Sequence, residues 1–534
     1  IKMSNIKIGW AERDVTTYGP AYIPGTFIMR ISEGVIDPLS TTALVVDSGD
    51  DMAIFLAIDC VVIRSFLLDE IRGKVTRRNP QIPVMKILAN STHAHTTPSH
   101  YYDGGKLDDS IKEMGHTDEE IQELIDKYIP ASLIGVPRDG MEIESSDEYR
   151  DFLSNQAADA ICEAYDKRTP GGITYGYGYA VVAHSRRTVY LDDISKRPGM
   201  KFSTHSSALQ GHAKMYGNTN DDKFSHYEAG ADHFINIMYT FTPVGELNGA
   251  VINIPCPSQN SESEANRRIT ADYWYDVRQK IREKHGNIPI LAQCAAGGDL
   301  SPHLLHYKEA RLRRFQLKYG GESKEEISRR VEALERRDIA ERVATAFDEI
   351  LSWAKNDIKN DAVVKHSVKT VELSRRIITD EEYEFAKEEL AKLEAEPYRM
   401  DQGSPKANLD YNSLLKAKRN RFLKVIDRYS SQEAEPKLPM EMHTIRIGDI
   451  AFASNRFELY MDYQHRIQAR SPFMQTFIVQ LAGQPGMDGG SYLCTERARV
   501  GRGYSASMFC NVVNCEGGQE LVEETLSALC ELVD

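Results

Sequence analysis

Short apolar runs that end in polar residues are the feature of this sequence that most restricts its fold. Residues 42–47 and 53–59 are two such runs, and the stretch 48–51 between them is typical of a hairpin turn. Residues 63–77 then space their apolar side chains as a helix does, and a third apolar run follows at 82–89. This strand–strand–helix–strand order predicts an α/β fold in which mixed β-sheets are layered with helices.

The middle of the chain differs from its two ends. Residues 304–440 are rich in charged side chains and have helical spacing, with 325–354 as the longest segment. Such a stretch is most often a solvated helical layer or a lid, and a binding tail is the alternative. We therefore expect an α/β core in two parts, 4–303 and 441–534, separated by the charged helical region 304–440.

Composition argues against several kinds of partner. The 534 residues carry a formal net charge of −14 and no long basic stripe, so we expect no nucleic-acid partner. No apolar run approaches the roughly 18 residues of a membrane helix, so we expect no membrane partner. The eight cysteines lack paired spacing, and residues 6–10 enter a strand without the features of a signal peptide. Both observations favour a cytoplasmic protein, and a homo-oligomer stays open.

Two histidines follow the third apolar run directly. Because successive side chains of a strand alternate between faces, we expect His93 and His95 on one face, within reach of one point. Imidazole is the commonest metal ligand and titrates near neutrality. Sites in open α/β sheets also gather at the carboxyl ends of strands. The pair therefore predicts a metal or acid–base site, and two solvated loop histidines are the alternative.

Four further segments, 183–187, 253–260, 297–303 and 455–460, place reactive side chains at predicted strand ends. They offer a guanidinium that can clamp oxygens, a thiol between two prolines, a glycine turn crowded with polar groups, and a carboxylate. The alternatives are a surface turn, an inert buried thiol, a tight turn, and an acid favoured by a helix dipole. The candidate residues are His184, Arg187, Cys256, Asp299, Ser301, His303 and Glu458.

The order of these motifs resembles the neutral (alkaline, non-lysosomal) ceramidase family over most of the chain. Residues 92–96 are similar to its T-H-T-H-S motif, and 297–302 to its A-G-D-V-S-P turn. Residues 447–458 look like its strand and metal-binding glutamate, and 491–495 resemble its late G-Y-x-x-T segment. The resemblance implies a divergent member with a ceramidase-like catalytic domain and a helical insertion, without the family's carboxy-terminal immunoglobulin-like domain.

The resemblance also implies a zinc centre. By motif matching, His93 and Glu458 would be metal ligands, and His95 would lie beside the metal. Tyr492 is implied as a further ligand or a polarising group.

The implied metal site departs from the family at one ligand. The family's second zinc histidine falls on or near Cys256, whose thiolate can also ligate zinc. A different divalent metal, such as Mn, Co or Ca, is the alternative. The turn that holds Asp299 and Ser301 is retained and is implied as the catalytic turn.

The altered ligand set and the histidine, arginine and tyrosine side chains favour a metal-dependent lyase that cleaves a glycoside or uronide-type carbohydrate by β-elimination. The metal would polarise a carbonyl and acidify the neighbouring C–H bond. His95 or Tyr492 would take the proton, while His184, Arg187 and His303 would hold the oxygens of a small polar substrate.

Two other functions remain open. The first is metal-dependent amide hydrolysis, as the resemblance implies, with His95 and Ser301 assisting the attack of water on an acyl carbon. The second is a non-catalytic binding protein on the same scaffold, although the retained His93, Asp299 and Glu458 count against it.

Overall fold

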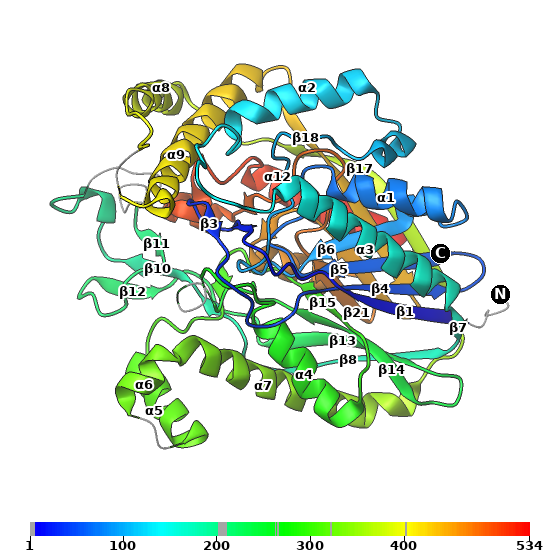
Figure 1. The fold of residues 1–534 in the computed structure, drawn as a ribbon. Coiled ribbons are helices and arrows are strands. Elements are labelled where there is room, and N and C mark those ends of the chain that lie inside the picture. Colours follow the sequence, from blue (N-terminus) through cyan, green and yellow to red (C-terminus); the bar gives the residue numbers. More distant parts are fainter. Residues whose placement is uncertain are drawn as a thin grey trace.

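Three β-sheets form the centre of the computed structural model, which describes residues 6–200, 211–261, 263, 266–320, 323–400 and 403–533 (Figure 1). Their strand orders are β6-β5-β4-β1-β7, β15-β14-β13-β8 and β17-β18-β19-β21. Each sheet is antiparallel except for one parallel pair at an edge, namely β5–β6, β14–β15 and β19–β21. The prediction of mixed sheets layered with helices is confirmed.

The bounds of the strands follow the apolar runs of the sequence. The first sheet consists of β1 (Lys7–Asp14), β4 (Ser40–Asp47), β5 (Met52–Ile58), β6 (Ile87–Ser91) and β7 (Thr169–Pro170). The second consists of β8 (Gly172–Tyr179), β13 (Phe234–Phe241), β14 (Leu247–Ile254) and β15 (Ile290–Cys294). The third consists of β17 (Val364–Ser374), β18 (Lys437–Ile447), β19 (Ile450–Ser454) and β21 (Gln475–Val479).

Shorter strands connect these sheets to the surface loops. They are β2 (Tyr22–Ile23) with β3 (Arg30–Ile31), β9 (His184–Ser185) with β16 (Leu300–Ser301), and β20 (Glu458–Leu459) with β22 (Tyr492–Leu493). A small three-stranded sheet contains β10 (Arg187–Tyr190), β11 (Ala213–Met215) and β12 (Phe224–Tyr227).

The three main sheets share one inner core. Side chains of all three sheets meet there, for example Leu44, Val251 and Phe452. On β4 the neighbouring Val45 points the other way and packs in the core beneath the helices. Because both faces of these strands are buried, the sequence shows nearly continuous apolar runs instead of alternation.

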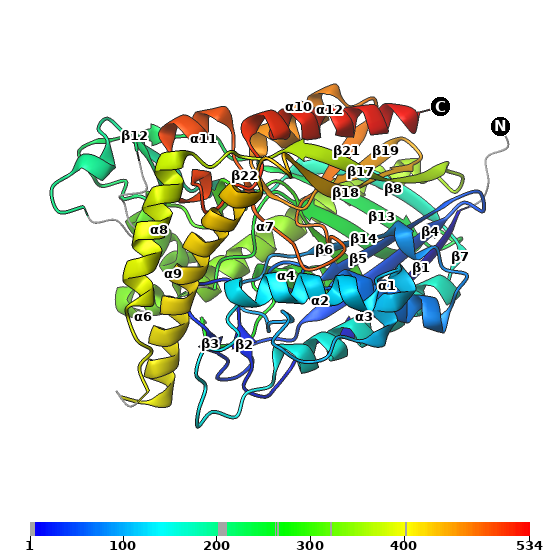
Figure 2. The same ribbon diagram turned by 90° about the horizontal axis from the view of Figure 1, so that it is seen from above.

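Each sheet has a helical layer on its outer face. In Figure 2, α10 and α12 lie on one side of the strands, and α1 and α3 lie on the other. The first sheet is covered by α1 (Leu67–Arg78) and α3 (Ser146–Asp166), the second by α4 (Tyr273–His285) and α7 (Val331–Ala354), and the third by α10 (Met461–Arg470) and α12 (Cys515–Glu531). The remaining helices are α2 (Asp118–Tyr128), α5 (Lys308–Tyr319), α6 (Lys324–Arg329), α8 (Asp380–Glu394), α9 (Pro405–Ser431) and α11 (Glu496–Gly501).

Hydrogen bonds tie the carboxyl ends of the three sheets together. The Asn90 amide, in the first sheet, donates to the Ala292 carbonyl of the second at 3.0 Å. The Asn253 amide, in the second sheet, donates to the Ile478 carbonyl of the third at 2.8 Å. These buried bonds join β6 to β15 and β14 to β21. The segments that follow β6, β14, β15 and β19 hold seven of the ten candidate residues.

The region 304–440 contains helices α5 to α9. It also contributes β17, an edge strand of the third sheet, and the first residues of β18. Strand β17 exposes Thr370 and Glu372 and leaves Lys365 and Lys369 half-buried, so its polar residues resemble those of the neighbouring helices in sequence. Helices α8 and α9 pack against each other at one end of the molecule (Figures 1 and 2).

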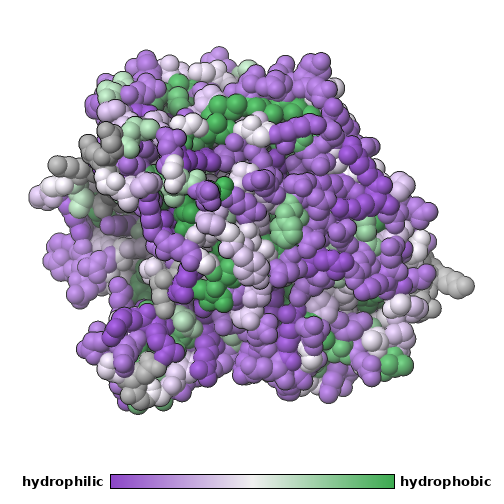
Figure 3. All heavy atoms as spheres, viewed as in Figure 1, coloured by the Kyte–Doolittle hydropathy of each residue, from purple (hydrophilic) through white to green (hydrophobic). Residues whose placement is uncertain are grey.

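The face of the molecule seen in Figure 3 is mainly hydrophilic, with separate small hydrophobic patches. Within the described ranges, none of the helices combines the length and the apolar character that crossing a lipid bilayer requires.

Candidate functional site

The loops that follow β6 and β19 meet in a cavity of about 370 Å³. Its walls include His93 and His95 from the first of these loops, Glu458 from the second, and Tyr492 from β22. These are four of the residues singled out from the sequence, and they come from positions almost 400 residues apart in a chain of 534 residues.

His93 sits at the centre of the group. Its backbone φ is +62°, a left-handed conformation that is uncommon outside glycine and often found at functional sites. Its Nδ1 lies 2.6 Å from the Val61 carbonyl, which can only accept, so Nδ1 carries the hydrogen. Its Nε2 lies 3.3 Å from His95 Nε2 and 3.3 Å from Glu458 Oε2.

Glu458 is ionised in this setting. Burial would raise its pKa, but His93 and the Arg186 guanidinium, 3.5 Å away, outweigh burial and hold the pKa at about 2. Strand β20 pairs in parallel with β22, which places Tyr492 opposite Glu458. The Tyr492 hydroxyl hydrogen bonds to Glu458 and accepts from Arg186 at 3.2 Å. Burial raises the pKa of Tyr492 well above its usual value, so its phenol stays protonated.

Two residues that the sequence did not single out complete the site. Arg186 donates to Gln259 Oε1 at 2.8 Å, which orients the amide so that its nitrogen faces His95. Gln259 Nε2 then donates to His95 Nε2 at 2.7 Å. Both lie beside candidates, Arg186 next to Arg187 and Gln259 three residues after Cys256. The sequence feature that could have pointed to Gln259 is the presence of amide side chains, besides the thiol, in the 253–260 segment.

The donors present fit a divalent cation. Two ligands of one tetrahedral zinc, each about 2.0–2.2 Å from the ion, lie about 3.4 Å apart. The 3.3 Å between His93 Nε2 and Glu458 Oε2 matches that separation, and a bound cation would take the place of the direct contact between them. Tyr492, which hydrogen bonds to Glu458, offers a further oxygen. Among the described residues, however, no group of three or more His, Cys, Asp or Glu side chains has the geometry to hold a metal.

The glycine turn supports this site from behind. A Cβ at Gly298 would lie 2.4 Å from the Glu458 carbonyl oxygen, so only glycine permits this approach. The Gly298 carbonyl accepts from Arg186 at 2.8 Å. The turn therefore fixes Glu458 and Arg186, and its glycine serves close backbone packing.

Three candidates from nearby turns are not among the described residues that line the cavity. The Cys256 side chain is fully buried in the core of the second sheet, and its thiol donates to the Pro257 carbonyl at 3.5 Å. Asp299 accepts from the Met461 amide at 3.0 Å, at the start of α10, and burial raises its pKa to about 6. Ser301 is buried and accepts from the His303 amide at 3.1 Å.

The residues expected to hold substrate oxygens have other partners. Arg187 forms a two-pronged ion pair with Glu228, at 2.8 and 2.7 Å. His303 Nδ1 lies 3.2 Å from a Glu335 oxygen. His184 pairs with Ser301 across β9 and β16, and burial lowers its pKa to about 4. The described lining of the cavity includes none of these three.

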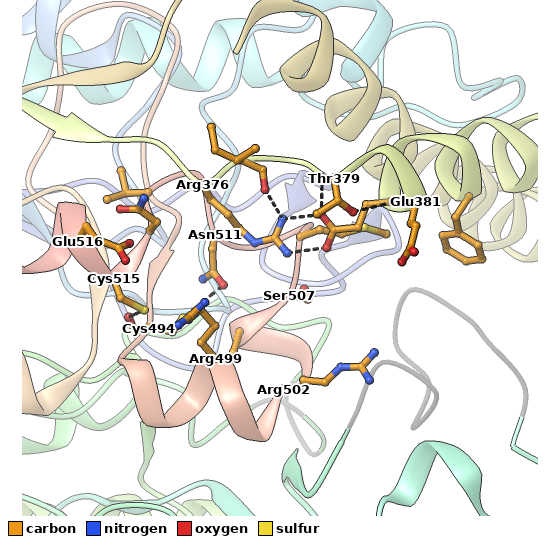
Figure 4. Close-up of a pocket in the computed structure, with 17 residues that line it drawn as sticks. Arg376, Thr379, Glu381, Cys494, Arg499, Arg502, Ser507, Asn511, Cys515 and Glu516 are labelled. Carbon is orange, nitrogen blue, oxygen red and sulfur yellow. Dashed lines mark hydrogen bonds and ion pairs between the residues drawn. The ribbon is translucent and has the colours of Figure 1, made fainter. Parts of the chain in front are cut away.

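A second and larger cavity, of about 610 Å³, lies between α8 and the segment that leads into α12 (Figure 4). Arg376 and Glu382 pair with each other there, and Cys494 and Cys515 form part of its wall. The described residues around it include no histidine. The candidate site is therefore assigned to the smaller cavity on its chemistry and not on size.

Two solved structures share this fold. The crystal structure of neutral ceramidase from Pseudomonas aeruginosa matches with a TM-score of 0.61 and 14% identity, over 100% of this chain and 75% of that one. A ceramidase complexed with C2 also gives 0.61 and 14%, over 99% of this chain and 76% of that one. No family model matches the sequence, and no curated protein matches it. The resemblance drawn from the motifs is confirmed as a ceramidase-like fold.

The prediction of a carbohydrate lyase is wrong. The two solved structures described above, which share the fold, are ceramidases, which are amide hydrolases, and not carbohydrate lyases. The prediction of a small polar carbohydrate substrate is wrong for the same reason. The contacts agree with this correction, because Arg187 and His303 are held by Glu228 and Glu335.

Proposed function

We propose that this protein is a hydrolase of N-acyl amides and that the cavity around His93 and Glu458 is its active site. The convergence of His93, His95 and Glu458 within 3.3 Å contacts is the observation that carries the proposal. The ceramidase-like fold supports it, since the ceramidases of known structure cleave an amide bond.

In the proposed reaction, water adds to the acyl carbon, the carbon–nitrogen bond breaks, and the amine leaves with a proton. His95 is suited to take the proton of the water at Nε2, the ring nitrogen that carries the lone pair, when its hydrogen bond from Gln259 is exchanged for one from the water. The neutral phenol of Tyr492 and the guanidinium of Arg186 are suited to stabilise negative charge that develops on the acyl oxygen.

A divalent cation would add to this site. His93 Nε2 and Glu458 Oε2 would hold it, and zinc is the ion whose usual ligand separation matches their distance. When bound, such an ion supplies a Lewis acid that polarises the acyl carbonyl.

The test of the proposed function is release of a carboxylic acid and an amine from N-acyl substrates, measured by mass spectrometry. We expect both products in equal amounts with the wild-type protein and none with His93→Ala. The matched control is His226→Ala, an exposed histidine whose described contact is to Ser225, and it should keep full activity. Absence of both products with every N-acyl substrate would overturn the proposal.

Metal content gives an independent reading of the same site. Elemental analysis of purified protein should find about one divalent ion per chain in the wild type and in His226→Ala. His93→Ala and Glu458→Ala should each lose it. Full metal content in either of these two variants would remove that residue from the ligand set.

A further inference from the structure

The cavity that holds the candidate site also carries an excess of positive charge. Four cationic side chains line it, and one of them, Arg138, is neutralised by a two-pronged pair with Asp103 at 2.6 and 2.8 Å. The other three are Arg64, Arg421 and Lys424. Within the described part of the chain, no carboxylate forms an ion pair with any of these three.

Aromatic rings take the place of carboxylates around the two arginines. The Arg64 guanidinium carbon lies 4.4 Å from the centre of the Tyr101 ring. The Arg421 guanidinium carbon lies 4.7 Å from the ring of Phe27 and 5.0 Å from that of Tyr504. A ring face attracts a cation but does not neutralise it, and it leaves N–H groups available to oxygen acceptors.

Lys424 lines the cavity together with Arg64 and Arg421, and its side chain stays exposed to solvent. Protein atoms around its ammonium, followed by the charges of Arg64 and Arg421, lower the pKa of Lys424 to about 8. Among the described residues, Asp488 opposes this shift, but it is exposed and makes no described ion pair with Lys424. Three like charges therefore face one cavity, and an anion bound there would offset their mutual repulsion.

The three cationic side chains come from helix α9 and from the loop between β5 and α1. Arg421 and Lys424 lie three residues apart on α9, and with Ala417 and Asn420 they form a single stripe that faces the cavity. Helix α9 belongs to the charged region 304–440, so this part of that region is a wall of the candidate site. Arg64 meets the stripe from the loop between β5 and α1.

We infer that the substrate carries an anionic group, a carboxylate, phosphate or sulfate, which Arg64, Arg421 and Lys424 bind while its amide lies at His93 and Glu458. This inference rests on the proposed amide hydrolysis and names the substrate class. Guanidinium and ammonium groups that lack carboxylate partners are the protein's usual means of holding such anions. The substrate is accordingly an N-acylated amino acid or an N-acylated amine that bears phosphate or sulfate.

A matched series of substrates tests the inference. N-acylglycine, N-acyl-phosphoethanolamine and uncharged N-acylethanolamine can carry the same acyl chain, and kcat/KM is measured for each. We expect at least a tenfold higher kcat/KM for one of the two charged substrates, and the preferred one identifies the group as a carboxylate or a phosphate. Equal values for all three would overturn the anion site and leave amide hydrolysis standing.

Variants on α9 then test which side chain causes the preference for a charged substrate. Lys424→Gln should lower the ratio of kcat/KM for charged over uncharged substrate by about tenfold. Lys418→Gln is the matched control, because Lys418 lies on the same helix but not in the lining of the cavity, and it should leave the ratio unchanged. An unchanged ratio in Lys424→Gln would overturn its assigned role.

Binding of inorganic phosphate separates the two proposals. Isothermal titration calorimetry should show binding to the wild type and to Lys418→Gln, with at least tenfold weaker binding to Lys424→Gln. This result without hydrolysis of any substrate would keep the anion site and reject amide hydrolysis. Equal phosphate affinity in wild type and Lys424→Gln would reject the anion site.

Discussion

Two clusters in this protein use the same side-chain types in different ways. In the candidate site, Glu458 lies near His93 and Arg186. In a second cluster, on strand β18 of the third sheet, Glu441 lies against His443 and Arg72. In both, a carboxylate faces a histidine and an arginine that overcome the effect of burial and lower its pKa to about 2.

The clusters differ in their distances and in what surrounds them. Arg72 donates to both oxygens of Glu441, at 2.6 and 3.1 Å, and His443 lies 2.9 Å away. In the candidate site the corresponding contacts of Glu458 are 3.3 and 3.5 Å, and a cavity opens beside them. The Glu441 cluster is closed by its own hydrogen bonds, while the Glu458 cluster leaves space and lone pairs for another species. The spacing, and not the residue types, separates a structural network from a reactive one.

The largest expected effect is on activity. Glu458→Gln should lower kcat/KM for an N-acyl substrate by about a thousandfold, a loss typical of removing a central polar group from an active site. Glu441→Gln, the matched change in the closed cluster, should leave kcat/KM within about threefold in folded protein. Similar losses in the two variants would erase the distinction between the clusters.

Stability should show the opposite order. Glu441→Gln leaves Arg72 buried without its partner and should lower the free energy of unfolding by about 3–5 kcal/mol. Glu458→Gln breaks longer contacts beside a cavity and should cost only about 1 kcal/mol. Urea denaturation of both variants measures the two costs, and a greater loss in Glu458→Gln would contradict the assignment of Glu441 as the structural cluster.

The free energy of unfolding should fall at low pH because the pKa of Glu441 is lowered, to about 2 in the folded protein against the usual 4.5. Between these values the unfolded chain binds more protons, so stability falls as pH falls. The contribution is full above about pH 4.5 and is lost as pH drops toward about 2. The difference in unfolding free energy between wild type and Glu441→Gln should therefore shrink over that window. A constant difference would show that the carboxylate of Glu441 is not held in its charged form.

The smallest effect concerns the glutamines that orient each cluster. Gln259 connects Arg186 to His95, and Gln484 bonds to the backbone of Glu441 on both sides. Gln259→Met should lower kcat by about tenfold and shift its pH profile, because His95 loses a hydrogen bond. Gln484→Met should lower stability and leave the pH profile unchanged. A shifted profile in Gln484→Met would count against a specific role for Gln259.

Much of the fold could be predicted from the sequence, because strands buried on both faces appear as continuous apolar runs. The runs at 42–47 and 53–59 became β4 and β5. Strand β17 could not be predicted, since its partly covered polar residues are of the same types as those of the helices around it. Local patterns do not reveal which face of a charged segment another part of the chain will cover.

The sequence predicted those residues of the candidate site whose side chains are positioned by the end of a strand. It did not predict those whose side chains are positioned by a turn. His93, His95 and Glu458 follow buried strands closely and converge. Arg186 lies between β9 and β10 and reaches the site, while Arg187, the first residue of β10, pairs with Glu228.

After β14, short turns decide which side chain of the segment faces the candidate site. The chain makes short turns in which the amides of Cys256 and Gln259 bond to Ile254 and Pro257. These turns bury the thiol of Cys256 and place the side-chain amide of Gln259 beside His95. A motif alignment could not predict this, because it does not show how the turns place each side chain.

The most direct test of amide hydrolysis at this site is a single-turnover reaction in water labelled with oxygen-18. The wild-type protein is mixed with a limiting amount of an N-acyl substrate, and the released acid is analysed by mass spectrometry. Hydrolysis at the His93–Glu458 site predicts one labelled oxygen in the carboxylate and an equal amount of free amine, both absent with Glu458→Gln. An acid without label, or equal product from Glu458→Gln, would contradict hydrolysis at this site.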